Sequence, residues 1–154
     1  MIRPWVRPGC GNAIAMASRA AAGYTAAMTA FLLVFLGAGI GGAARHAVNL
    51  GCARSCGDAF PWGTLTVNVV GSFAMGLIAG WFAFKAGEGW SQHARLFLTT
   101  GVLGGFTTFS AFSLDAMLLW ERGEALAAAV YVGASVALSI LALAGALAIL
   151  RSLT

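Results

Sequence analysis

Four long uncharged stretches, each mostly apolar, divide the chain. The first begins at about Ala27 and ends at Arg45–His46, and the others are residues 62–84, 96–114 and 125–150. A helix of about 20 apolar residues crosses roughly 30 Å of hydrocarbon. The pattern therefore predicts an all-α integral membrane protein with four transmembrane helices, whose short connections leave no room for a separate soluble domain.

The first 23 residues differ from the spans that follow. They contain three arginines, no acid and a Pro-Trp-Val-Arg-Pro-Gly stretch that is too broken for a helix. Two explanations fit this composition: a targeting segment, or a start codon assigned too early, since Met16 and Met28 follow. We expect residues 1–23 to be a poorly ordered leader and residues 24–154 to form the membrane domain.

Composition excludes an ordinary soluble domain. Of the 154 residues, 60% are hydrophobic and only 9% are charged, whereas soluble domains carry roughly 25% charged residues. The net charge of +4 comes from basic residues that are scattered along the chain, so it indicates membrane topology and not nucleic-acid binding. The 21 glycines favour close packing of membrane helices.

The basic residues outside the leader are balanced across the membrane. Four spans place both termini on one side, and Lys and Arg near the spans set orientation. That side carries Lys85, Arg95 and Arg151, and the other carries Arg45, Arg54 and Arg122. Because this balance specifies no orientation, we hypothesise that the protein inserts both ways and pairs as an antiparallel, dual-topology homodimer.

Two of the predicted helices carry polar side chains at intervals of four residues, which places them along one helix face. Such groups are costly in hydrocarbon unless they face partners or water. Their general alternative role is to hold helices together, but two complete stripes favour a polar path. The stripes are Thr64, Asn68 and Ser72, and Tyr131, Ser135 and Ser139.

The third span contains a sequence that is unfavourable for a helix. Gly104-Gly105 is followed by Thr107-Thr108, which combines two flexible glycines with two adjacent β-branched residues. We expect a break in the helix here, near the middle of the membrane. Broken backbone at that depth is tolerated where it lines a cavity or coordinates an ion.

Aromatic and hydroxyl side chains follow the expected break. Phe109 and Phe112 lie on one helix face, next to Ser110, and a ring edge attracts an anion. The predicted interior is rich in neutral hydrogen-bond donors and poor in acids, which favours a small anion over a cation or proton. Arg45 would attract anions to an entrance, or simply mark the end of its span.

Three motifs resemble those of the CrcB/Fluc family of fluoride channels, over about residues 28–152. They are Gly41-Gly-Ala-Ala-Arg45, Gly63-Thr-Leu-Thr-Val-Asn68-Val-Val-Gly-Ser72 and Gly104-Gly-Phe-Thr-Thr-Phe-Ser-Ala-Phe-Ser113. The resemblance implies a dual-topology homodimer with two antiparallel pores that export fluoride passively across the bacterial cytoplasmic membrane. Ala111 departs from the family, in which many members have threonine.

The resemblance also implies roles for individual residues. Phe109 and Phe112 would present their ring edges to the ion, and Asn68 would be the pore amide. A structural sodium ion at the dimer centre would be held by the backbone carbonyls of Gly104 and Thr107. The remaining polar positions along the path would be Thr64, Ser110, Tyr131, Ser135 and Ser139, with Arg45 at the vestibule.

Two other functions remain as alternatives. A small dual-topology, proton-coupled exporter needs an ionisable group deep in the membrane, whereas Asp115 lies toward the end of its span. A helix-packing protein without transport would explain the Gly-x3-Gly spacings but not the polar stripes. We expect no enzymatic activity, because no catalytic set of residues can be assembled in or near the membrane.

Overall fold

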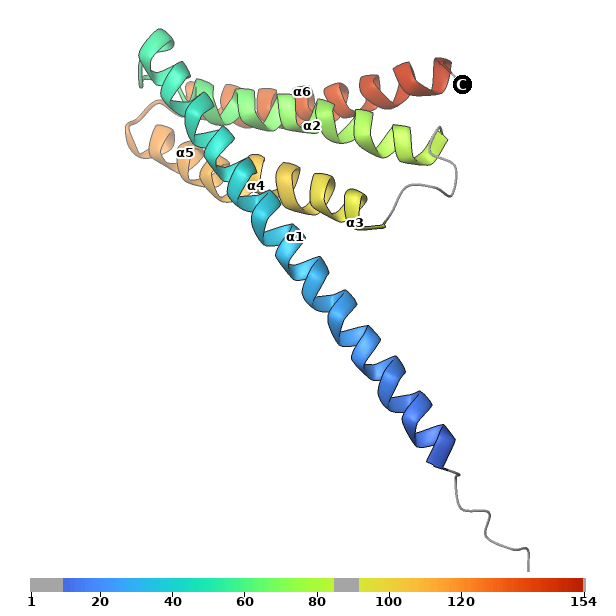
Figure 1. Cartoon of the computed structure of the whole chain (residues 1–154). Coiled ribbons are helices and arrows are strands. Elements are labelled where there is room, and N and C mark those ends of the chain that lie inside the picture. Colours follow the sequence, from blue (N-terminus) through green and yellow to red (C-terminus); the bar gives the residue numbers. More distant parts are fainter. Residues whose placement is uncertain (1–9, 85–91, 154) are drawn as a thin grey trace, which may run out of the picture.

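A computed structural model of the chain describes residues 10–84 and 92–153, and every regular element in these ranges is helical (Figure 1). Four helical stretches there are long and apolar enough to cross a membrane: Gly23–Cys56, Trp62–Phe84, Gln92–Glu121 and Ala125–Ser152. The elements are α1 (Cys10–Cys56), α2 (Trp62–Phe84), α3 (Gln92–Arg95), the π-helix η1 (Leu96–Leu103), α4 (Gly104–Phe106), α5 (Phe109–Glu121) and α6 (Ala125–Ser152).

The prediction of four apolar spanning helices is confirmed. The second helix has the predicted bounds, and the fourth begins at Ala125 as predicted and ends at Ser152. The third span is made of four consecutive elements, α3, η1, α4 and α5. Its apolar stretch is therefore continuous in sequence while its helical geometry changes along its length.

Helix α1 is longer than predicted at both ends. It begins at Cys10, so residues 10–23 of the expected leader are helical, because that segment is rich in alanine, a strong helix former. It also passes through Arg45–His46, since a charged residue does not end a helix. The helix ends where Gly57 adopts a positive φ of 75° and donates its N–H to Ala53 O, a common helix stop. Residues 1–9 lie outside the described ranges.

Small residues bring α1 against the third span. A Cβ on Gly37 would lie 2.9 Å from the Cα of Gly101, and one on Gly105 would run into the carbonyl oxygen of Ala38. Close backbone contact of this kind needs glycine or alanine at the crossing. Figure 1 shows α1 crossing this span while its N-terminal half projects away from the other helices.

Helices α2 and α6 lie side by side (Figure 1), with Gly76 against Leu143. Helices α5 and α6 are joined by a tight turn. Gly123, with φ of 80°, donates to Trp120 O, and Glu124 donates to Leu119 O, which is the Schellman pattern. The turn packs α5 against α6 around a buried cluster of Phe112, Leu119, Ala128 and Tyr131.

Candidate functional site: two cavities beside an interrupted helix

Helical backbone is interrupted at two threonines in the third span. Thr107 (φ −76°, ψ 157°) and Thr108 (φ −153°, ψ 121°) are extended between α4 and α5. The Thr107 hydroxyl donates to Leu103 O at 3.0 Å, and the Thr108 hydroxyl accepts the N–H of Ala111 at 3.2 Å. Leu103 O also accepts the N–H of Thr107 at 3.0 Å, so the Thr107 hydroxyl adds a second bond at the end of α4, while the Thr108 hydroxyl caps the start of α5. Gly104 and Gly105 remain helical in α4.

Asn68 on α2 bridges the main chain at this interruption. Its Nδ2 donates to Thr108 O at 3.0 Å, and its Oδ1 accepts the N–H of Thr108 at 2.9 Å. One side-chain amide therefore satisfies both polar groups of an extended residue, which buried backbone requires. The Asn68 amide carries two N–H bonds, so one of them is used in this bridge.

A cavity of about 330 Å³ lies beside this bridge. Elements α2, α5 and α6 contribute to it, together with the two extended threonines. Among the described residues that line it, none is charged, and the polar ones carry hydroxyl or amide groups. The polar and aromatic lining residues are Asn68, Ser72, Thr107, Thr108, Phe109, Phe112, Ser135 and Ser139.

The two phenylalanines of the cavity differ in exposure. Their ring centroids are 5.4 Å apart at an interplanar angle of 43°. Phe112 is 9% exposed, and its ring packs on Tyr131 with centroids 5.4 Å apart. Phe109 is 78% exposed. Packing within the chain therefore fixes one ring, while the other lies open at the surface of the single chain.

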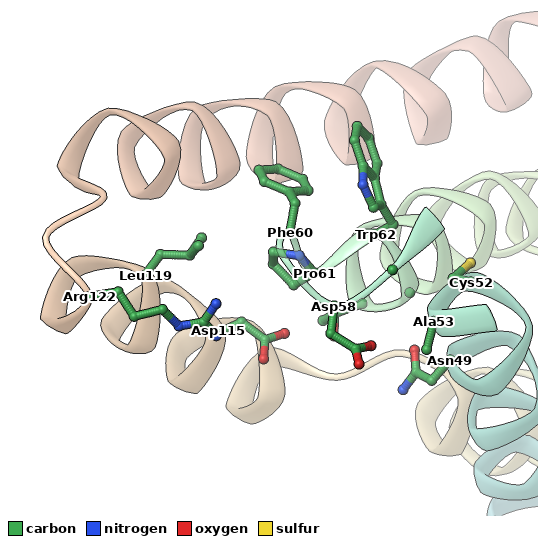
Figure 2. Close-up of a pocket in the computed structure, with 13 residues that line it drawn as sticks. Asn49, Cys52, Ala53, Asp58, Phe60, Pro61, Trp62, Asp115, Leu119 and Arg122 are labelled. Atoms are coloured by element: carbon green, nitrogen blue, oxygen red, sulfur yellow. The ribbon is translucent and has the colours of Figure 1, made fainter. Parts of the chain in front are cut away.

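A second cavity of about 240 Å³ lies near the loop between α1 and α2. Its lining includes Thr64 and three charged residues, Asp58, Asp115 and Arg122. Figure 2 shows these charged side chains turned toward the same space. This cavity therefore differs from the first in being charged.

Tyr131 lies between the two cavities. Its side chain is fully buried, and its ring contacts Phe112 of the first cavity and Phe60 of the second, with centroids 5.6 Å apart. Its hydroxyl donates to Oδ2 of Asp115 at 3.3 Å. Tyr131 thus connects the two linings: its hydroxyl and one ring contact reach residues of the charged cavity, and the other ring contact reaches Phe112 of the uncharged one.

The position of Asp115 toward the end of its span did not predict its contact with Tyr131. A signal was present in the sequence, because the two residues lie eight positions before and after Gly123. A tight turn at that glycine makes α5 and α6 antiparallel neighbours. Positions equally distant from the turn then lie at the same level along the two helices, and the packing of α5 on α6 decides which of them face each other.

The other predicted residues have varied environments. Ser135 is 5% exposed, and its hydroxyl in the first cavity has no hydrogen-bond partner among the described residues. Ser110 is exposed, with its hydroxyl 3.3 Å from that of Thr108. Arg45 is half-buried and lines neither cavity. Gly104 is exposed at the start of α4.

Comparisons with known proteins agree with these features. Residues 32–147 match the family model described as "CrcB-like protein, Camphor Resistance (CrcB)". The chain is 59% identical over 124 residues to the "Fluoride-specific ion channel FluC" of Rhodopseudomonas palustris (strain BisB5), covering 80% of this chain and 98% of that relative. It is 58% identical over 120 residues to a protein of the same name from Methylobacterium nodulans, covering 78% and 94% of the two chains.

A third relative, the "Fluoride-specific ion channel FluC" of Granulibacter bethesdensis, is 57% identical over 126 residues, or 82% of this chain and 98% of the relative. The matched region includes the motifs that carry Asn68, Phe109 and Phe112. With four apolar spanning helices and bacterial relatives of this kind, the protein is a multi-pass bacterial membrane protein. The chain belongs to the CrcB family.

Proposed function

We propose that the protein is a fluoride-selective channel through which fluoride leaves the cytoplasm passively across the bacterial inner membrane. The relatives described above are named as fluoride-specific ion channels. The observation that carries the proposal is the 330 Å³ cavity, which combines hydroxyls, an amide and two phenyl rings and has no charged residue in its described lining.

The chemistry of this lining suits a small anion. Hydroxyl and amide donors replace the water shell of a compact ion, while the absence of a full positive charge lets the ion leave again. The buried hydroxyl of Ser135 has no partner within the described chain, so it is available as a donor. Ring edges of Phe109 and Phe112 add a weak positive potential.

The proposed path continues from the first cavity to the second. From Ser139 and Ser135 the ion passes the two phenylalanines and Tyr131, and then reaches Thr64 in the charged cavity. There the guanidinium of Arg122 compensates one of the two negative charges that Asp58 and Asp115 bring to the lining. Ser110 and Arg45, which lie outside both linings, act at the surface of the path and near its entrance.

We propose further that two chains pair as an antiparallel homodimer with two pores. The balanced basic residues favour insertion in both orientations. The 78% exposure of Phe109 also supports a partner. A ring that borders an ion path would be buried by a second chain on the side that its own chain leaves open. In this arrangement the interruption at Thr107 and Thr108 lies near the middle of the membrane.

A sodium ion at the dimer centre is the remaining part of the proposal. Thr107 leaves helical conformation, which frees its carbonyl from the regular pattern, and Gly104 is exposed and has no side chain to shield its carbonyl. Gly104 stays helical, but the N–H of Thr108, four residues later, is donated to Asn68 Oδ1, so both carbonyls lie where the helical hydrogen-bond pattern is interrupted and fit the ion. Bound there, sodium supplies positive charge that holds the two interruptions together.

Replacement of sodium by a large organic cation tests this site. We expect the dimer to melt at a lower temperature and to carry less fluoride in N-methylglucamine than in sodium at equal ionic strength. The matched control compares two sodium salts, so that an effect of the anion is recognised. Equal stability and equal efflux in the two cations would contradict the sodium site.

A passive channel differs from a proton-coupled exporter in its response to a pH gradient. We expect liposomes that contain the purified protein to release fluoride down its concentration gradient at the same initial rate with or without an imposed pH gradient. Valinomycin and potassium clamp the membrane potential in both cases. Fluoride that leaves only when protons move in the opposite direction would contradict the channel and support the exporter.

A further inference from the structure

The motif that carries Asn68 continues to Gly71, a glycine in the lining of the first cavity to which the proposed path assigns no role. Gly71 lies three residues after Asn68 on α2, a spacing that places both on one helix face. It is buried, and a Cβ there would run into the Cγ2 methyl of Thr107 and lie 3.2 Å from Cδ1 of Phe106. The missing side chain of Gly71 therefore leaves the space that the Thr107 methyl occupies.

Thr107 is held at three points by this arrangement. Its methyl group rests on Gly71, and its hydroxyl and its backbone N–H both donate to Leu103 O at 3.0 Å. The next residue, Thr108, is held by the Asn68 amide. Both extended residues are thus fixed by one face of α2, the first through shape and the second through hydrogen bonds.

We propose that Gly71 is a positioning residue for the ion path: by receiving the Thr107 methyl, it places the extended segment so that Asn68 can bridge Thr108 and the path past Phe109 stays open. The inference rests on the proposed channel function. Overpacking at such a contact forces neighbouring side chains and backbone to shift, and the backbone next to this contact is the extended segment Thr107–Thr108.

Moving one methyl group from Thr107 to Gly71 tests whether the fit between these two residues positions the extended segment. Gly71→Ala adds one carbon where Thr107→Ser removes one, and serine keeps the hydroxyl that donates to Leu103 O. We expect Gly71→Ala to lower fluoride efflux per folded protein by about tenfold or more. Thr107→Ser alone removes the methyl contact with Gly71, so we expect it to lower the melting temperature, and we expect the double variant to recover most of the efflux that Gly71→Ala loses.

Gly76→Ala is the matched control, because Gly76 is a buried glycine of the same helix packed on Leu143, with its Cβ position 2.6 Å from the carbonyl oxygen. It should lower the melting temperature, and Thr107→Ser should not rescue it. If Gly71→Ala alone fails to fold, the fluoride efflux of the double variant still tests the proposal. A double variant that conducts supports the proposal, and one that stays inactive contradicts it, as does unchanged efflux in Gly71→Ala.

Melting temperatures of the unchanged protein, Gly71→Ala, Thr107→Ser and the double variant test this inference separately from the proposed function. If the unchanged protein carries no fluoride, the proposed channel function is wrong. The melting temperatures of the two single variants and the double variant still test the contact between Gly71 and Thr107. Recovery of the melting temperature in the double variant would then support the fit between Gly71 and Thr107. Additive losses would overturn it.

Discussion

Asn68→Asp is expected to lower fluoride efflux by about a thousandfold. A carboxylate at this position places a negative charge in the cavity through which the anion passes. At about 4 Å and an effective dielectric constant of about 20, repulsion between two unit charges is about 4 kcal/mol, which corresponds to about a thousandfold. The substitution also replaces the N–H that donates to Thr108 O with a second acceptor oxygen.

Efflux from liposomes, normalised to folded protein, measures this effect. Gln92→Glu is a suitable control, because it makes the same amide-to-acid change at an exposed position on α3 outside both cavities. We expect the control to conduct normally. Normal efflux in Asn68→Asp would exclude Asn68 from the ion path.

Gly41→Ala is expected to have the largest effect on stability. A Cβ on Gly41 would run into the carbonyl oxygen of Val102 and lie 2.7 Å from the backbone nitrogen of Phe106. Both are main-chain atoms, which cannot rotate aside, so α1 would have to separate from η1 and α4. Overpacking of about 3 kcal/mol would lower the melting temperature by roughly 10 °C in a chain of this size.

Thermal unfolding of the purified protein in detergent tests this expectation, with Gly39→Ala as the control on the same helix. Apart from its chain neighbours and the nearby backbone of its own helix, no described atom lies within 4 Å of a Cβ built on Gly39, and alanine favours a helix over glycine. We therefore expect the control to melt at the same temperature or slightly higher. Equal losses in both variants would contradict the packing of α1 described above.

The positions of the spans could be predicted from the sequence because few charges interrupt them. The bounds of α2 followed directly from an apolar run between Trp62 and Lys85. The ends of α1 could not be predicted in this way, since hydropathy detects where a helix enters lipid and not where it stops. Its true end depends on the conformation of Gly57, which the apolar pattern does not reveal.

The polar stripes predicted residues that line the cavities, but not which of the two cavities each residue lines. Thr64 and Asn68 lie on one helix face, yet they line different cavities, because one helical turn advances the chain by about 5.4 Å. The contact between Asp115 and Tyr131 depends on how α5 packs on α6. Such contacts follow from the tertiary arrangement, which spacing within one helix cannot supply.

Discrimination between fluoride and chloride tests the central claim most directly. Liposomes that contain the purified protein would be loaded with equal concentrations of the two anions, and valinomycin with a potassium gradient would start efflux. Ion-selective electrodes would follow both anions in the same sample. The proposed channel predicts rapid release of fluoride while chloride stays inside at the level of protein-free liposomes. Equal release of both anions, or no release of fluoride, would contradict it.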